Sequence, residues 1–465
     1  MTKSKIINMK IDFSTFKLIS IFFAATSLFI TMFIRNSNCQ NLSFIQDAEI
    51  ENTLLEWVLP LYKVAGLNSN SVKMYLINDD SINAFVAGGQ NIFINTGLIL
   101  HSLDHEAVIG VMAHEIGHIA GGHLIRTEIA REQSTAAAAI GTIVTVGLLV
   151  AGQIADVDIG GTSNLGTLGM TVAQRTFLKH TRDNEKTADI SALKYLNLVG
   201  RSARPLAKIL KIIGKQELLH ESRQDPYLRT HPFFKDRIET IEANISANKL
   251  KYVENPEEKL RYQRIVAKII AFTEPPGKTL LLYPKNNNSI ANRYARAIAY
   301  LRMPDFNKGL SEINYLIKNY PKDPYFPELL GQMFFENGKP EKAITALKLS
   351  LDLLPNEHSI MLSLARAQLE VNKKNQTIEA LKNLKKIIEM NSEDLHAWRL
   401  ISISEARLGN HGRANLAAAE RAYRIGKFDL AIGFAKKARK IFKKGTPNDL
   451  RAQDIIFYSS EKNIK

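Results

Sequence analysis

Cysteine is almost absent from this sequence, because Cys39 is its single copy among 465 residues. One thiol can form neither an intramolecular disulfide nor a zinc cluster built from thiolates. Any metal ion in this protein must therefore bind to histidine and carboxylate side chains. The remaining composition, 45% hydrophobic and 23% charged, is that of a globular protein. The chain is too long for one ordinary core, so we expect two or three domains.

Long uncharged runs are also scarce, and the first of them lies near the N-terminus. It extends from Leu18 to Ile34, which is 17 residues, and four lysines precede it. This length is long for the apolar part of a signal peptide and short for a membrane-spanning helix. Ser37 and Cys39 are small residues at positions suited to cleavage before Gln40. We expect residues 1–39 to be a cleaved export signal, with a retained N-terminal anchor as the alternative.

The second uncharged run covers residues 133–155. Its 23 residues are enough to span a bilayer, but Gly141, Gly147 and Gly152 interrupt it. A buried helix or a helical hairpin is therefore the preferred interpretation, and contact with a membrane stays open. Residues 156–169 are rich in Gly, Ser and Thr and are expected to form a loop.

Acidic residues fall short of basic ones mainly in the last third of the chain. Residues 40–289 hold 26 basic and 26 acidic groups, whereas residues 290–465 hold 30 basic and 19 acidic groups, a net charge of +11. A basic domain attracts anionic partners, such as acidic protein segments or lipid headgroups. No nucleic-acid motif accompanies the charge, so we expect no nucleic acid among the partners.

The first half of the chain predicts an α+β domain that is mainly helical with a small sheet. Apolar residues at helical spacing mark three segments: 43–66, 103–125 and 170–198. Pro60 lies in the first of these and could end that helix early. Residues 72–77 predict one strand, and residues 85–96 predict two strands joined at Gly88-Gly89.

After residue 290 the sequence changes to repeated helix pairs. Six residues lie at offsets that match the tetratricopeptide pattern: Gly331, Ala343, Pro355, Trp398, Ala414 and Ala431. Ala343 and Ala414 are 71 positions apart, about two periods of the ~34-residue repeat, and residues 372–376 look like an insert between them. We predict at least three repeats in an all-α domain at 291–465, joined to a first domain at 40–270 by a linker at 271–290.

A five-residue run, His114-Glu115-Ile116-Gly117-His118, lies inside the helix predicted at 103–125. Residues four apart share one helical face, so His114 and His118 can offer imidazole nitrogens to one zinc ion. Glu115 lies beside the first ligand, where its carboxylate can take a proton from a water on that ion. The run therefore predicts one Zn²⁺ per chain and hydrolysis of a peptide bond.

Glu185 is the expected third ligand. A histidine ten residues after His114 would complete a three-histidine site, but that position is Leu124. His123 is one residue away and is turned off the ligand face, so we interpret it as a surface residue or a neighbour of a ligand. Glu185 and Asp189 share one face of a predicted helix. Glu185 can bind zinc, and Asp189 can hold the free nitrogen of a ligand histidine.

At these residues the chain resembles a known family of membrane-associated zinc peptidases, which includes HtpX, the CaaX prenyl endopeptidase and the periplasmic BepA. The segments that carry the resemblance lie within residues 40–270: Asn83-Ala84-Phe85 with Gly88-Gly89 and Thr96-Gly97-Leu98, His114 to His118, Glu185 to Asp189, and Thr230-His231-Pro232 with Arg237. The repeats and the export-like N-terminus make the chain most similar in organisation to BepA-like members.

The resemblance implies a gluzincin-type fold and gives two further sets of residues a role. The strand pair from Phe85 to Ile94 would be an edge that pairs with an extended substrate, through Asn83, Ala84, Phe85, Gly88 and Gly89. His231 would approach the zinc ion and hold the enzyme closed. A residue before proline is held extended, so His231 can serve as a fourth ligand or, when protonated, as a donor to the oxyanion.

The sequence therefore predicts an exported zinc metalloendopeptidase, followed by tetratricopeptide repeats that dock clients or partners. The resemblance implies a periplasmic enzyme, in contact with a membrane surface, that acts on misassembled outer-membrane β-barrel proteins or their assembly machinery. One alternative is an inner-membrane quality-control protease, which needs residues 18–34 or 133–155 to span the bilayer. The other is a chaperone or scaffold with a latent zinc site.

Overall fold

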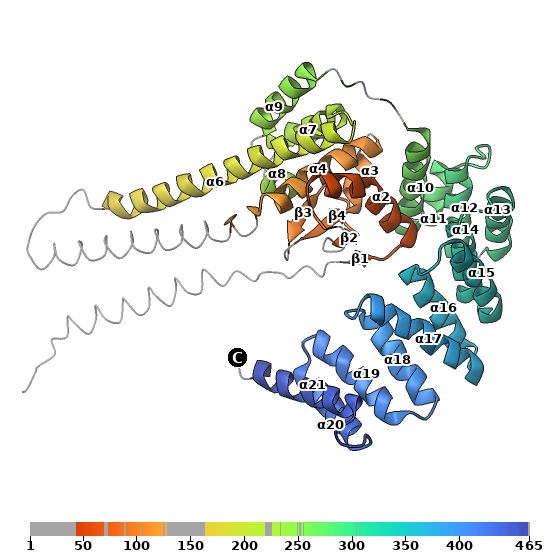
Figure 1. The fold of residues 1–465 in the computed structure, drawn as a ribbon. Helices are drawn as coiled ribbons and strands as arrows, with labels where there is room; N and C mark the ends of the chain where they lie inside the picture. Colours follow the sequence, from red (N-terminus) through yellow and green to blue (C-terminus); the bar gives the residue numbers. More distant parts are fainter. Residues whose placement is uncertain are drawn as a thin grey trace, which may run out of the picture. The chain divides into compact units, whose positions relative to one another are not determined.

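The computed structural model describes residues 43–463, apart from 69–72, 88–89, 103, 124–125, 128–162, 219–225, 233, 249, 251–252, 254 and 304 (Figure 1). Phe44–Lys465 form one compact unit. The predicted export segment 1–39, the turn Gly88-Gly89 and the uncharged run 133–155 lie outside the described residues. Among the helices that are described, none is both long and apolar enough to cross a membrane.

A four-stranded sheet lies in the N-terminal part of this unit. Its strands are β1 (Phe44–Ile45), β2 (Lys73–Ile77), β3 (Ala84–Ala87) and β4 (Asn91–Asn95), in the order β1-β2-β4-β3. β3 and β4 are antiparallel, as the sequence predicted, and β4 is parallel to β2. Of the pair β3 and β4, only β3 is therefore at an edge of the sheet. The expectation that the whole pair forms an edge needs correction, because β4 lies between two hydrogen-bonded neighbours.

Alternation of side chains along the strands gives the sheet two different faces. Ile92 and Ile94 of β4 are buried in one core with residues of the neighbouring helices, such as Trp57. Phe93 points to the opposite face and stacks between Tyr75 and Phe85, with ring centroids 5.0 Å apart in both pairs. Packing between this apolar face and the helices holds the sheet in place against them.

Helices make up most of the rest of the N-terminal part. They are α2 (Ala48–Val64), α3 (Thr96–His101), α4 (His105–Ala120), α6 (Ser163–Leu198), α7 (Arg204–Gly214), α8 (Pro226–Thr230) and α9 (Phe234–Ala247), with a 3-10 helix at Lys215–Leu218. Pro60 lies within α2 and does not end it. α6 begins at Ser163, so the loop predicted at 156–169 is helical from that residue onward. α4 and α6 pack side by side (Figure 1).

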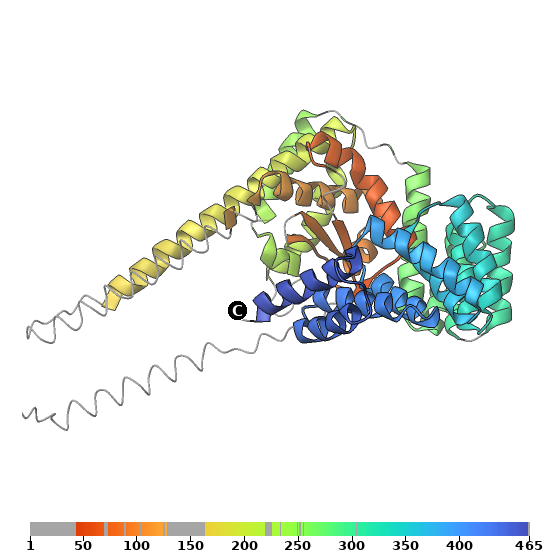
Figure 2. The ribbon, with the colours of Figure 1, turned by 60° about the horizontal axis from the view of Figure 1, so that its bottom comes forward.

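Ten helices in five hairpins follow α10 (Pro256–Thr273) and α11 (Pro276–Leu282), which occupy part of the predicted linker. The hairpins are α12 (Ile290–Arg302) with α13 (Phe306–Asn319), α14 (Tyr325–Glu336) with α15 (Pro340–Leu353), α16 (His358–Glu370) with α17 (Lys374–Met390), α18 (Leu395–Arg407) with α19 (His411–Arg424), and α20 (Phe428–Arg439) with α21 (Pro447–Asn463). Successive helices pack against one another along this series (Figure 2).

The predicted insert at 372–376 is not an extra loop. Asn372 has φ 56°, the left-handed conformation that Gly338 and Gly409 adopt in the neighbouring hairpins with φ 66° and 79°. Asparagine tolerates this conformation better than most residues, so the tight turn is retained without glycine. The additional residues lengthen α17, which has 17 residues where α15 and α19 have 14.

α10 joins the first strands and helices to the repeats through buried charges. The Nζ of Lys268 lies 2.7 Å from Asp47, 3.3 Å from Glu49 and 3.8 Å from Oε2 of Glu328 in α14. Lys268 is 3% exposed, so these carboxylates provide its compensation in place of water. One turn earlier, Arg264 pairs with Glu49 at 2.6 Å.

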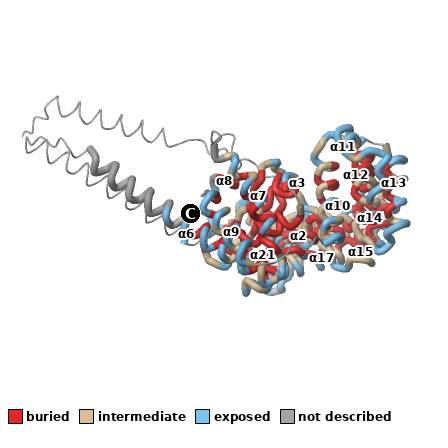
Figure 3. The backbone as a smooth tube through the Cα atoms, turned by 90° about the horizontal axis from the view of Figure 1, so that it is seen from above, coloured by how far each residue is buried: buried red, intermediate tan, exposed pale blue. Residues whose placement is uncertain are grey.

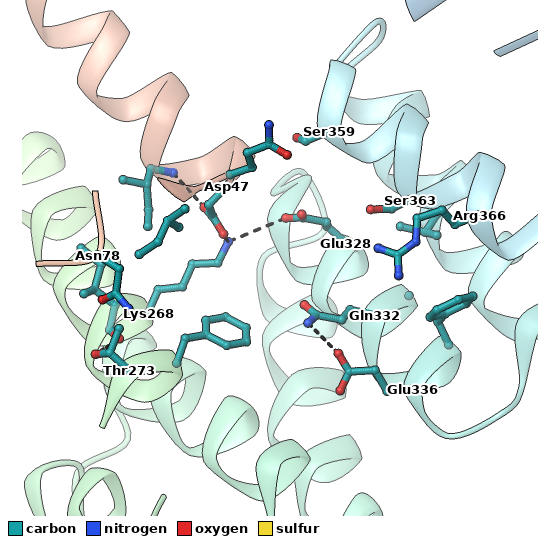
Figure 4. A pocket seen from close by; sticks show the side chains of 18 residues that line it. Asp47, Asn78, Lys268, Thr273, Glu328, Gln332, Glu336, Ser359, Ser363 and Arg366 are labelled. Atoms are coloured by element: carbon teal, nitrogen blue, oxygen red, sulfur yellow. Dashed lines mark hydrogen bonds and ion pairs between the residues drawn. The ribbon is translucent and has the colours of Figure 1, made fainter. Parts of the chain in front are cut away.

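A cavity of about 470 Å³ lies beside these charges, between α10, α14 and α16 (Figure 4). Asp47 and Lys268 lie on one side of it, and Glu328 points toward them from α14. Glu336 and Arg366 line the part of the cavity farther from Lys268. Away from the cavity, buried positions run through α3 and α7 in the first part and through α12 and α14 in the repeats (Figure 3).

Candidate metal centre

Helix α4 carries His114, Glu115 and His118 into the interior. Asp104 caps the helix by accepting a hydrogen bond from the N–H of Ala107 at 2.9 Å. His114 and Glu115 are fully buried, and the side chain of His118 is 12% exposed. The helical repeat places the two imidazoles on one face with ring centroids 4.6 Å apart, as their spacing predicts.

Gly117 sets the distance between α4 and α6. A Cβ atom at this position would lie 2.7 Å from the carbonyl oxygen of Ala188 in α6. Any other residue would push the two helices apart. Glycine therefore allows the histidine-bearing helix to reach the helix that carries Glu185 and Asp189.

Glu185 faces both His114 and His118 of α4. Its Oε2 lies 3.3 Å from Nε2 of His114, and its Oε1 lies 3.3 Å from Nε2 of His118. His231, which directly follows α8, places its Nδ1 3.2 Å from both Glu185 oxygens. One ligand atom from each of these four residues lies within 4.8 Å of the others. The structure therefore brings together the three predicted ligands and His231.

The imidazoles of His114 and His118 each have a second polar contact through the other ring nitrogen. Asp189 Oδ1 lies 2.8 Å from Nδ1 of His114, and Nδ1 of His123 lies 2.9 Å from Nδ1 of His118. Contacts of this kind fix the orientation and tautomer of a ligand histidine. His123 is 2% exposed. It is therefore a buried neighbour of a candidate ligand and lies outside the four-residue group.

Arg237 of α9 ties the outer part of the site together. Its Nε and Nη2 donate to the two oxygens of Asp189 at 2.8 and 2.9 Å, the two-pronged geometry that suits a carboxylate. Its Nη1 donates to the backbone carbonyl of His231 at 3.1 Å. Arg237 is 3% exposed. One buried guanidinium thus fixes both the carboxylate behind His114 and the backbone of His231.

His231 lies between Glu185 and Glu115. Its Nε2 is 3.5 Å from Oε1 of Glu115, on the side opposite the Nδ1 contact with Glu185. The ring stacks on Tyr227, with centroids 4.4 Å apart and an interplanar angle of 30°. Pro232 follows and restricts the backbone of His231 to extended conformations. This imidazole is held beside the candidate base and the candidate ligands together.

Burial and charge set the protonation of the site. Burial raises the pKa of Glu115 above its ordinary value, which suits a carboxylate that must accept a proton. Burial also acts on Glu185, but His231, His114 and His118 outweigh it and hold the Glu185 pKa well below its usual range. Burial lowers the pKa of His118 to about 3, so this imidazole stays neutral and can donate a lone pair.

The donor set fits a zinc ion. Imidazole nitrogens and a carboxylate oxygen are zinc ligands, and a catalytic site uses three protein ligands and keeps a fourth position open. Both oxygens of Glu115 and Nε2 of His231 are buried without a hydrogen bond to any described residue. Buried polar atoms without a partner mark a place that another group must fill, here a solvent molecule or a substrate.

The residues predicted to bind substrate lie along the edge strand. Ala84 and Phe85 belong to β3, Asn83 precedes it and is 6% exposed, and Phe85 is partly exposed. β3 contacts both α4 and α8, so this edge runs beside the helix of the candidate base. Gly88 and Gly89 fall outside the described residues.

Sequence reasoning left two residues of the site without a role. Arg237 was part of a segment that matched the family, but no partner was predicted for it. Its place six residues after His231 could have suggested an ion pair with the acid Asp189. Tyr227 was missed, because a single tyrosine in a short helix carries no pattern. Both positions depend on α8 and α9 folding back onto α6.

A second cluster of His105, Glu106 and Glu258 could also present ligand atoms to a metal. Arg201 already donates to both carboxylates, at 2.5 Å to Glu106 and 2.6 Å to Glu258. The guanidinium supplies the positive charge that these acids need. We interpret this cluster as a buried ion-pair group that joins the start of α4 to α10.

Comparison with known proteins follows the same division of the chain. Residues 45–245 match Peptidase family M48, and residues 294–358 match a tetratricopeptide repeat. A protein of Escherichia coli (strain K12) named "Beta-barrel assembly-enhancing protease" is 26% identical over 407 residues, which cover 83% of this chain and 78% of that protein. The Yersinia pestis protein of the same name is 24% identical over 392 residues, covering 83% and 79%.

"Metalloprotease LoiP" of Escherichia coli (strain K12) is 31% identical over 180 residues, which cover 38% of this chain and 64% of that protein.

The structure and the two family matches confirm the predicted fold, a mainly helical domain with a small sheet followed by an all-α repeat region. The resemblance noted in the sequence is confirmed as well. Residues 45–245 are therefore a zinc metallopeptidase domain that matches family M48, and tetratricopeptide repeats follow it in the chain.

Proposed function

We propose that this protein is an endopeptidase in which Glu115 is the general base and His114, His118 and Glu185 hold the zinc ion. The observation that carries the proposal is the convergence of these side chains in one buried group with His231. When bound there, zinc supplies Lewis acidity to the water and to the peptide carbonyl that react. Glu115 accepts the proton of the attacking water and delivers it to the leaving amine.

Other residues position these groups. Asp189, held by Arg237, orients the ring of His114. β3 presents a sheet edge beside α4, where an extended peptide can add as a further strand. Backbone pairing of this type is tolerant of side-chain sequence, which suits an enzyme acting on many unfolded clients.

His231 gives the site a latent state in this proposal. Its Nδ1 lies 3.4 Å from Nε2 of His114 and 3.2 Å from Glu185, within the same group of ligand atoms. If its imidazole served as a fourth ligand to the zinc ion, it would exclude the water that Glu115 must deprotonate. Movement of the segment that carries His231 would then switch the enzyme on.

The biological setting proposed here is the periplasm, with unassembled outer-membrane β-barrel proteins or their assembly machinery as clients. Its support is the name of relatives that align with 83% of this chain, "Beta-barrel assembly-enhancing protease", together with the export-like N-terminus. The repeats would dock clients or partners, because stacked helical hairpins offer extended binding surfaces.

Fractionation of cells and a client assay test this setting. The protein should be released with the periplasmic fraction, and a β-barrel protein that fails to assemble should persist longer in cells with Glu115→Gln than in wild-type cells. A cytoplasmic location would contradict the proposal.

Alkaline carbonate extraction separates the membrane alternatives, since retention in the pellet would favour an inner-membrane quality-control protease. Equal client decay in both strains would favour a chaperone or scaffold with an idle zinc site.

A further inference from the structure

The turn between α20 and α21 carries an unusual concentration of positive charge. Lys440, Lys443 and Lys444 in this turn are exposed, as are Lys436 and Lys437 in the last turn of α20 just before it. No carboxylate elsewhere in the described chain forms an ion pair with any of the five. Between Asp429 and Asp449 the sequence contains no acidic residue at all. This segment therefore concentrates much of the basic excess of the last third of the chain in one place.

An aliphatic side chain projects from the middle of this charge. Ile441 is 57% exposed, and lysines flank it on both sides in the sequence. Its neighbour Phe442 turns inward and packs with the core of the last hairpin. The two residues thus divide the turn into an anchored aromatic and a protruding aliphatic residue.

The turn is held in a fixed shape. Asp449 accepts hydrogen bonds from Nε of Arg439 at 2.8 Å and from the N–H of Gly445 at 3.0 Å, so it joins both ends of the turn. Gly445 has φ 79°, in the left-handed region that glycine enters without strain. Arg439 is used internally, which leaves the lysines to face outward.

Helix α19 packs against the turn through Gly412. A Cβ atom on Gly412 would lie 2.8 Å from Phe442 and 3.2 Å from Ile441, so glycine is needed for the turn to sit this close. The next residue, Arg413, is exposed and adds a further cation beside the turn. The lysines are therefore presented on a fixed support, and none of them lines the cavity beside Lys268.

We propose that this turn docks the protein onto an anionic membrane surface, with Ile441 inserted among the lipids and the lysines against headgroup phosphates. An exposed aliphatic residue among exposed lysines matches the boundary of an anionic bilayer, where headgroup phosphates lie next to acyl chains. Lysine also suits a diffuse negative surface, because it is a mobile point charge, whereas arginine serves geometrically defined carboxylate pairs. The proposal does not depend on peptidase activity.

Vesicle binding of the full chain tests the proposal, in a Glu115→Gln background that prevents self-cleavage. Ile441→Trp places a fluorophore at the tip of the turn, and binding is measured to vesicles with 30% phosphatidylglycerol and to neutral phosphatidylcholine vesicles. The emission should shift to the blue only with the anionic vesicles, and brominated lipids should quench it. Trp57 and Trp398 also emit, so the spectra of the Glu115→Gln protein without Ile441→Trp are recorded in parallel and subtracted. Membrane contact through residues 1–39 alone leaves no shift in this difference.

Charge variants complete the test. Lys440→Gln, Lys443→Gln and Lys444→Gln together should weaken binding to anionic vesicles by on the order of 100-fold, since each lysine near such a surface contributes about fivefold. Lys348→Gln, Lys374→Gln and Lys382→Gln change the same charge on exposed positions of α15 and α17 and should have little effect. Equal loss in both triple variants, or an unshifted tryptophan, would overturn the proposal. A shift with soluble polyglutamate but not with vesicles would assign the turn to an acidic polypeptide instead.

Discussion

Asp189 Oδ1 lies 2.8 Å from Nδ1 of His114, and Arg237 donates two hydrogen bonds to the same carboxylate. Three elements, α4, α6 and α9, meet in this contact. Arg237 and Asp189 are 48 residues apart in the chain. The orientation of one candidate zinc ligand therefore depends on a helix far downstream of the His-Glu motif.

Replacement of Arg237 should weaken both the fold and the metal site. Arg237→Ala leaves the Asp189 carboxylate buried without its cation, an arrangement that costs about 3–5 kcal/mol of folding free energy. Zinc affinity should fall by roughly 10–100-fold, because the group that orients His114 loses its own support. Competition with a chelator measures the affinity, and thermal unfolding measures the stability. Lys235→Ala, an exposed basic residue of the same helix, is the control and should change neither. Unchanged zinc affinity in Arg237→Ala would remove this residue from the site.

A methyl group at Gly117 should disturb the metal site, because Gly117 lies at the contact between α4 and α6. The added Cβ would lie 2.7 Å from the Ala188 carbonyl, so α4 and α6 must separate. We expect Gly117→Ala to cost about 1–3 kcal/mol of stability, the range for overpacked cores, and to lower zinc retention. Gly433→Ala is the matched change at an exposed position of α20 with open space around it, and it should stabilise by up to about 1 kcal/mol. A neutral Gly117→Ala would mean that the two helices tolerate a wider separation.

The role of His231 can be assigned from whether His231→Ala raises or lowers proteolytic activity. If it blocks the fourth zinc position, His231→Ala should raise casein cleavage or self-cleavage, and zinc should be retained by the other three ligands. If it donates to the oxyanion, the same change should lower turnover by ~10²–10³-fold, the scale of a lost oxyanion donor. We expect activation. An unchanged rate would leave His231 without a role in switching.

The contribution of Glu328, which lies beside Lys268, to stability should fall with rising pH. Burial, with Asp47 and Glu49 close by, raises the pKa of Glu328 to about 7 from an ordinary value of 4.5. A carboxyl group whose folded-state pKa is raised binds more protons in the folded state between pH 4.5 and 7. Its contribution to stability is therefore greatest below pH 4.5 and is lost as the pH rises to 7.

Glu328→Gln tests this pH dependence, because the amide mimics the protonated acid at every pH. The variant should unfold at a higher temperature than wild type at pH 8 and at a similar temperature at pH 4.5. Glu336→Gln changes an exposed acid of the same helix and should show no such pH dependence. A lower melting temperature of Glu328→Gln at pH 8 would show that the ion pair with Lys268 outweighs the cost of burying the charge.

The sequence predicted what local periodicity determines. Helical spacing placed His114 with His118, and Glu185 with Asp189, because residues four apart share a face. The hairpins of the repeat region followed from the same periodicity. The insert at 372–376 was misread, since Asn372 can replace glycine in a left-handed turn and the pattern shows only the missing glycine.

Contacts between distant elements could not be read in this way. The role of Arg237 depends on how α9 packs against α6, and the buried charges of Lys268 depend on how α10 meets α2 and α14. No local sequence pattern predicts such pairs, because each partner on its own resembles an ordinary charged residue of the surface. The internal place of β4 in the sheet has the same origin, since strand order depends on the parallel pairing with β2.

Zinc content measured together with proteolysis tests the central claim most directly. Purified wild-type protein should hold about one zinc per chain, and Glu185→Ala or His114→Ala should lose it. Glu115→Gln should keep the zinc and lose cleavage of casein and of itself, because an amide cannot accept the proton of the attacking water. Zinc retained by Glu185→Ala would show that the third ligand is another residue. Proteolysis retained by Glu115→Gln would contradict the account of this protein as a zinc peptidase with Glu115 as its base.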